Sequence, residues 1–288
     1  MRAILCTILA GLLAAASLPV VAQDGGGGEE KKSDVFTPPD AAKNPPPEST
    51  PPPVVVVPTG YPVSEVERPL VLPRMTLEPD AAFFINFISG QGDNIIGLLL
   101  GASMGIVDKL EAGFHMPLAM SPEFKAGELV FHGAYDLTSL VNVPNLMLAG
   151  RANLAVATSD HFRGMGSGAF GTDFGLLFQG LTKYKFAQMF AMFATVGLGF
   201  TGGPGGFAFE LDLGPIVNPM EALAIELHFG IRKLAKDGFP TLIPLYVQAQ
   251  YTIGRDLDAF VRFGFPDLNH AGSDSIILMV GAAYRISL

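Results

Sequence analysis

The last ten residues of the chain, 279–288, carry the pattern that most restricts how it can fold. Apolar and small or polar side chains alternate there: one face holds Tyr284, Ile286 and Leu288, and the other holds Ala283, Arg285 and Ser287. A period of two is typical of a β-strand whose faces meet different surroundings. In an exported chain, an ending of this kind favours a strand whose apolar face points toward lipid.

The first 22 residues have the composition of an export signal. Arg2 is followed by an apolar stretch up to Leu18, and the small residue Ala22 comes just before Gln23. This arrangement predicts cleavage after Ala22; the alternative is an uncleaved membrane anchor, because the stretch is almost long enough to span a bilayer. Cys6 is the only cysteine, so cleavage leaves a mature chain without disulfides, thiol catalysis or zinc–thiolate sites.

Composition narrows the class of protein further. The chain has 288 residues, of which 49% are hydrophobic and only 16% are charged, with 34 glycines and 22 phenylalanines. This is too apolar for a typical soluble protein, and the glycines favour strands and turns over helices. The formal net charge is −9, and loss of Arg2 makes it −9 − 1 = −10. An acidic chain without a basic run argues against nucleic acid as a partner.

Residues 23–68 differ in texture from everything that follows. They hold four consecutive glycines at 25–28 and runs of proline at 45–47 and 51–53. Such a segment cannot bury a core, so we expect a disordered or polyproline linker. It is either a spacer or a segment that binds the cell wall or another protein, and we expect its deletion to leave the fold intact.

From about residue 69 onward the chain alternates between apolar and small or polar residues. In 223–231 the apolar face repeats at every second position, whereas Glu226 and His228 lie on the other face. We predict about twelve strands of roughly nine to fifteen residues, long enough to cross a bilayer when tilted. They are expected at 74–88, 93–106, 110–120, 128–139, 143–157, 168–180, 185–200, 205–217, 221–235, 240–253, 257–265 and 274–288.

Tight turns are expected at 107–109, 218–220 and 254–256, and longer loops at 121–127, 158–167 and 266–273. Short turns at one end and long loops at the other, with an even strand number, are the usual rule for bacterial barrels. The predicted fold is therefore all-β: a transmembrane antiparallel up-and-down β-barrel over residues 69–288, with the linker as a disordered, proline-rich N-terminal arm.

The region from Met75 to Leu288 resembles the bacterial outer-membrane β-barrel superfamily, in its small porin-like branch. Residues 101–113, GASMGIVDKLEAG, resemble its recurrent hairpin of strand, short turn containing Asp, and strand. The resemblance implies that the chain end is an assembly signal read by the barrel-insertion machinery. The residues that carry this signal are Gly281, Tyr284, Ile286 and Leu288, the last standing where the family most often has Phe. With no Trp in the chain, Phe and Tyr must form any aromatic girdle.

Charged and histidine side chains opposite the apolar face are candidates for lining the lumen. Facing lipid, an Arg or Lys near the midplane would cost about 2–4 kcal/mol. The candidates are Glu78, Asp80, Glu111, His115, His132, Asp136, Arg151, Asp173, Glu210, Asp212, Glu226, His228, Arg232, Arg262 and Arg285. They could set up a transverse field in a pore, or pair with one another and close the interior.

Signals for chemistry are weak. Outer-membrane lipid hydrolases carry a His followed two residues later by Ser, and none of the five histidines has this neighbour. The glycine-rich stretches 164–168 and 202–206 lack the Lys-Ser/Thr of a phosphate loop, and no metal-ligand spacing is present. We therefore expect no enzyme activity, no cofactor and no metal.

The function that these patterns favour is a narrow porin-like channel or solute-binding barrel in the outer membrane. The alternative is a closed structural barrel that anchors the envelope through its proline-rich arm; an outer-membrane hydrolase is a minor third possibility. The expected partners are outer-membrane lipid, the barrel-insertion machinery and, through residues 23–68 in the periplasm, peptidoglycan or a periplasmic protein.

Overall fold

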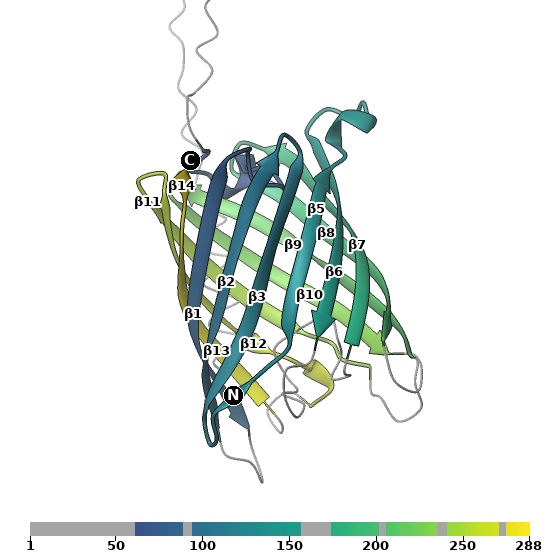
Figure 1. Cartoon of the computed structure of the whole chain (residues 1–288). Coiled ribbons are helices and arrows are strands. Elements are labelled where there is room, and N and C mark those ends of the chain that lie inside the picture. Colours follow the sequence, from purple (N-terminus) through teal and green to yellow (C-terminus); the bar gives the residue numbers. More distant parts are fainter. Residues whose placement is uncertain (1–60, 89–93, 157–173, 202–205, 235–240, 271–274) are drawn as a thin grey trace, which may run out of the picture. The chain divides into compact units, whose positions relative to one another are not determined.

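Twelve long strands and a few short elements make up the computed structural model of this chain (Figure 1). It describes residues 61–88, 94–156, 174–201, 206–234, 241–270 and 275–288. The long strands are β1 (Thr76–Ile88), β2 (Ile95–Val107), β3 (Leu110–Ser121), β5 (Leu129–Asp136), β6 (Leu146–Val156), β7 (Phe174–Ala187), β8 (Phe190–Thr201), β9 (Gly206–Met220), β10 (Leu223–Leu234), β11 (Leu245–Ile253), β12 (Leu257–Phe265) and β13 (Ser275–Tyr284).

The short elements are two-residue strands and single 3-10 turns. They are β4 (Lys125–Ala126), β14 (Ile286–Ser287), η1 (Glu65–Glu67), η2 (Thr138–Leu140) and η3 (Leu268–His270). Within the described residues, no helix is both long enough and apolar enough to cross a membrane.

Each long strand pairs with its neighbours along the chain in antiparallel register, and the sheet closes on itself. The closing pair is β1 with β13, from Asp80 opposite Ala283 to Ile88 opposite Ser275. β14 extends this seam by pairing with the start of β1. Because the first and last strands meet, the backbone groups along the seam are paired. The predicted up-and-down barrel of about twelve strands is confirmed.

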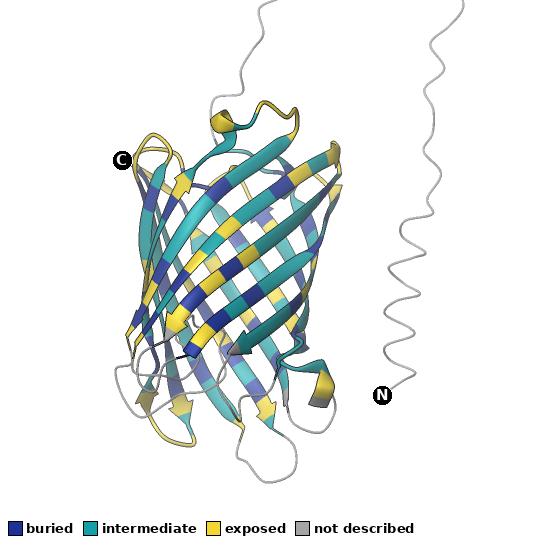
Figure 2. Cartoon of the chain, turned by 90° about the vertical axis from the view of Figure 1, so that its right-hand side faces the viewer, coloured by how far each residue is buried: buried dark blue, intermediate teal, exposed yellow. Residues whose placement is uncertain are grey.

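Exposure alternates along the strands as a barrel with an apolar outer face requires (Figure 2). In β1, Phe83 and Phe87 are 40% and 43% exposed, whereas Phe84 is fully buried and Asn86 is 6% exposed. In β10, Leu227 and Phe229 are exposed, whereas Glu226, the residue before Leu227, is buried. The large apolar side chains thus face outward, and the inward positions hold mainly small, polar and charged residues.

Four of the five connections at one end of the barrel are short, and the chain end lies at the same end (Figure 1). The turns at 108–109 and 254–256 lie where the sequence predicted them. The turn predicted at 218–220 is wrong, because those residues complete β9 and the reversal falls at 221–222. Of the predicted long loops, 158–167 lies outside the described residues.

The break expected at 181–184 is also wrong, since β7 continues to Ala187. These residues lay between the strands predicted at 168–180 and 185–200, but they keep the strand alternation: Tyr184 is exposed and Lys183 is only 2% exposed. Lys183 points into the barrel, where it binds a segment that the sequence had placed in the linker.

Residues 61–72, which we call the inner segment, run through the inside of the barrel at the end with the tight turns. Val66 is fully buried and packs against Ala191 and Ile216, while Val71 packs against Ala134 and Ala149. The structure thus differs from the expected linker boundary at residue 68. The last part of that range, residues 61–68, has a single proline, and its Val66 and Arg68 find partners on the barrel wall.

The inner segment leaves the interior where the chain turns into β1. The Met75 amide donates to the Gly105 carbonyl at 2.7 Å, and the Leu288 amide donates to the Met75 carbonyl at 2.8 Å. Gly105 permits this close passage, because a Cβ at that position would lie 1.9 Å from the Pro73 carbonyl oxygen. The place where the inner segment leaves the interior and the end of the chain are therefore held at the same point of the barrel.

Candidate functional site

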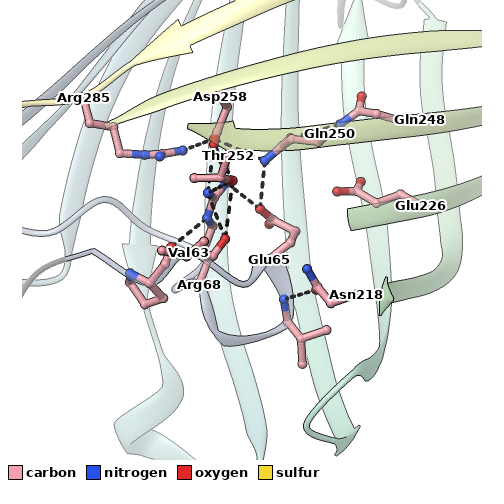
Figure 3. A network of polar contacts seen from close by, with 12 residues as sticks. Val63, Glu65, Arg68, Asn218, Glu226, Gln248, Gln250, Thr252, Asp258 and Arg285 are labelled. Carbon is pink, nitrogen blue, oxygen red and sulfur yellow. Dashed lines mark hydrogen bonds and ion pairs between the residues drawn. The ribbon is translucent and has the colours of Figure 1, made fainter. Parts of the chain in front are cut away.

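A buried ion network fixes the inner segment to the barrel wall (Figure 3). The Arg68 guanidinium, on a residue that is 3% exposed, donates to both carboxylate oxygens of Asp258 at 2.7 and 2.9 Å. It also donates to Glu65 and to the Thr252 hydroxyl, each at 2.8 Å. Arg285 reaches Asp258 from the other side. A two-pronged pair of this kind is among the stronger hydrogen-bonded contacts in proteins.

Side chains of the wall also satisfy the backbone of the inner segment. The Lys183 ammonium donates to the carbonyls of Glu65 and Arg68 at 2.8 and 2.5 Å. The Asn218 side-chain oxygen accepts from the Val66 amide at 3.1 Å, and a Glu111 carboxylate oxygen accepts from the Leu72 amide at 2.8 Å. A segment without strand partners needs such contacts, because unpaired buried backbone groups are costly.

The electrostatics of the inner segment follow from its enclosure. Burial raises the pKa of Glu65, and the positive charge of Arg68 offsets only part of this. Burial also raises the pKa of Tyr61, whose ring lies under the Arg285 guanidinium at 4.3 Å from its centroid. For Arg68, burial acts to lower the pKa, but the hydrogen-bonded Asp258 raises it above the ordinary value.

The residues predicted to line the lumen lie at inward-facing positions of their strands, apart from Arg285, which is buried just after β13, and Asp173, which lies outside the described residues. Two of them join the ion network. They are Arg285 and Glu78, whose side chains form an ion pair at 2.6 Å. Asp136 lies apart at the end of β5, where its carboxylate accepts from the Thr138 amide at 2.8 Å.

A second group lies on β9, β10 and β12. His228 contacts Asp212 through Nδ1 at 3.2 Å and Glu226 through Nε2 at 3.0 Å. On the same strands Arg232 approaches Glu210 at 3.6 Å, and Arg262 donates to Gln248 at 2.9 Å. Here the interior charges largely pair with one another. Among the described residues, no three His, Cys, Asp or Glu side chains are grouped so that they could hold a metal ion.

The third group surrounds a cavity of about 380 Å³ between the inner segment and β1, β2, β3, β5 and β6. The predicted residues that line it are Glu78, Asp80, Glu111, His115, His132 and Arg151, and it also includes Ser103 and Asn153. His132 Nε2 lies 3.2 Å from a Glu111 carboxylate oxygen and 3.3 Å from the Ser103 hydroxyl.

Ser103, His132 and Glu111 resemble the members of a hydrolase triad, but their geometry differs from one. In a triad the serine and the acid bind opposite nitrogens of the imidazole, so that the acid orients the ring while the ring takes the serine proton. Here both contacts reach the same nitrogen, Nε2. The arrangement is a polar cluster on the cavity wall rather than a relay toward a nucleophile.

Several residues that bind the inner segment at this end of the barrel were not predicted from the sequence. Asp258 shares the inward face of β12 with Arg262 and could have been found by parity. Lys183 fell between two predicted strands, and Arg68 fell in the expected linker. Asn218 and Thr252 carry no charge, so alternation alone gave them no special weight.

The residues predicted as an assembly signal lie on the last strands. Tyr284, Ile286 and Leu288 are 50%, 36% and 60% exposed on the outer face. Gly281 lies on the inward face, where a Cβ would come within 2.6 Å of the Ala82 side chain. Their role in assembly stays a prediction.

The sequence matches no protein-family model and no curated protein. Solved structures, however, share the architecture. The NanC porin aligns over 72% of this chain and 100% of its own, with a TM-score of 0.57 and 6% identity. An outer membrane channel from Pseudomonas putida F1 aligns over 80% of this chain and 100% of its own, with a TM-score of 0.54 and 12% identity.

The chain has the fold of a small, porin-like outer-membrane β-barrel. At these levels of identity the likeness concerns the fold, and the solutes of the neighbours do not transfer. The site therefore has to be interpreted from its own residues.

Proposed function

We propose that this protein is a narrow outer-membrane channel for small polar solutes, constricted at one end by the inner segment. The observation that carries the proposal is a charged interior that is not filled: a cavity of about 380 Å³ remains beside the inner segment, lined by Asp80, Arg151 and two histidines. A barrel interior used only for packing has no need of charged groups around open space, because burying charge is costly.

The proposal places the tight-turn end in the periplasm, since short turns lie on that side in bacterial barrels. Peptidoglycan or a periplasmic protein is then the proposed partner of residues 23–60. The exposed apolar face contacts outer-membrane lipid, and the final strand is proposed to be read by the barrel-insertion machinery.

Single-channel recording in planar bilayers tests the proposal. We expect small, stable conductance steps from the full mature chain in a simple salt, with weak ion selectivity because acids and arginines both line the interior. Folded protein that inserts, as shown by a heat-modifiable band, yet never conducts would favour the rival function, a closed barrel that anchors the envelope. Neither function assigns the protein a catalytic step.

A further inference from the structure

The cavity beside the inner segment is lined by two chemically different sets of residues. The inner segment contributes Pro69, Leu70 and Leu72, and β2 adds Leu99. The rest of the lining is mostly polar and charged, with Asp80 on β1 and Arg151 on β6. These two strands are separated in the sheet by β2, β3 and β5, so the two charges approach the cavity from different parts of the wall.

Asp80 is a carboxylate with space prepared for it and, among the described residues, no ion-paired partner; the charge of His132 acts on it without an ion-pair contact. Among the described residues no hydrogen bond or ion pair to its side chain is found. The residue opposite it on β2 is Gly101, and a Cβ there would lie 2.4 Å from the Asp80 Oδ2 atom. The glycine therefore leaves room for a charge that no ion pair within the described residues neutralises.

Arg151 is the complementary cation, and among the described residues no hydrogen bond from its guanidinium is found. Its Nη2 atom lies 3.8 Å from a Glu111 oxygen, beyond hydrogen-bond distance. That carboxylate already accepts from the Leu72 amide and contacts His132. The Arg151 side chain is 30% exposed although it faces the barrel interior, and within the described residues its Nε atom has no partner.

We propose that this cavity binds a small apolar zwitterion, an amino acid or short peptide. Its amine would bind Asp80, its carboxylate would bind Arg151, and its apolar side chains would pack on Leu70, Leu72 and Leu99. A simple amine would leave the guanidinium unpaired, and a simple carboxylate would leave Asp80 unpaired. The inference deepens the proposed channel function by naming the solute class, and it rests on that function.

The test is block of the ionic current through the full-length protein in planar bilayers. The probes are leucine and leucyl-leucine, compared with isoamylamine, which lacks the carboxylate, and 4-methylpentanoate, which lacks the amine. At least one zwitterion should block at a concentration about tenfold lower than either analogue, since one charge-assisted hydrogen bond contributes about that factor. The more potent of the two zwitterions shows which length fits the cavity.

Two variants assign the contacts. Asp80→Asn should weaken block by the zwitterions about tenfold and leave block by 4-methylpentanoate unchanged. Arg151→Gln should weaken block by the zwitterions as well, but leave block by isoamylamine unchanged. Asp108→Asn and Arg74→Gln, at exposed positions outside the cavity, are matched controls that should behave as wild type. A heat-modifiable band confirms that each variant is folded.

Equal potency of all four probes, or unchanged block by the more potent zwitterion in Asp80→Asn, would overturn the assignment while leaving a conducting channel intact. Absence of any conductance would instead contradict the proposed function. In that case, titration calorimetry of the same probes with the detergent-solubilised protein still decides whether the cavity binds zwitterions, and no heat from either zwitterion would overturn the inference.

Discussion

Replacing Arg68 with alanine should release the inner segment from the wall while the barrel stays folded. Arg68 supplies both hydrogen bonds of the segment to Asp258 and another to Thr252, whereas the closing seam of the barrel does not involve it. Removal of the guanidinium leaves Asp258 buried with Arg285 as its remaining cationic partner and with hydrogen bonds from Thr252 and Gln250. The perturbation therefore acts on docking of the segment and leaves the strand ladders unchanged.

The size of the effect follows from this remaining partner. Breaking a buried pair by removing one member costs about 3–5 kcal/mol. Because Arg285 still contacts Asp258, the lower end applies, about 3 kcal/mol. This corresponds to an increase of about 100-fold in the ratio of released to docked segment. A segment that is rarely released in the wild type would therefore be released in the variant for an easily measured share of the time.

Single-channel recording measures this ratio as the share of time spent at a higher conductance level. Arg74→Ala is the matched control, because Arg74 is exposed, close in sequence and outside the network. If Arg68→Ala conducts with the same levels and dwell times as wild type, the network does not hold the constriction. If the variant instead loses the heat-modifiable folded band, the inner segment is part of the barrel core rather than a docked element.

Further measurements test other parts of the account. Nitroxide labels at Ile225 and Glu226 should report lipid and water respectively; equal water accessibility would contradict the strand faces of β10. Deletion of residues 23–60 should leave the heat-modifiable band and its melting temperature unchanged, and a lower melting temperature would show that these residues support the fold. Because burial raises the pKa of Glu65, the docked state binds a proton more readily than the released state, so docking is strongest below the ordinary carboxyl pKa and weakens as the pH rises through the raised value. The released share should therefore be larger near pH 8 than near pH 5, and Glu65→Gln should remove the difference. Finally, Leu288→Asp should lower the amount of protein in outer-membrane fractions while Leu288→Phe preserves it; normal levels of the Asp variant would reject the assembly signal.

The barrel could be predicted from sequence because its governing pattern is local. Each strand meets lipid on one side and the interior on the other, so the alternation is visible within a few residues, as in 223–231. The strand ends were less certain. At Lys183 and Asn218 polar residues lie inside strands because the inner segment binds them, and alternation of hydrophobicity cannot show an internal partner.

The inner segment could not be predicted because its stabilising contacts are distant in the chain. Arg68 meets Asp258 across 190 positions, and Val66 meets Asn218 across 152. Its composition, with prolines and few regular repeats, is that of a linker. Residues 23–60 also hold apolar positions, such as the four valines at 54–57, so apolar content does not set the inner segment apart. Its arginine does, and the importance of Arg68 appears only when the wall that receives it is known.

The same contacts explain why the alternation of residues along each strand gave a candidate site that was too broad. Every inward charge looks equivalent along a strand, yet the inner segment divides them. Glu111 and Asp258 serve the segment, one through the Leu72 amide and the other through Arg68. Asp80 and Arg151 face the space that the segment leaves open, without a hydrogen bond to it among the described residues. The segment therefore does more than narrow the barrel: by neutralising one set of wall charges it determines which charges remain available to a solute.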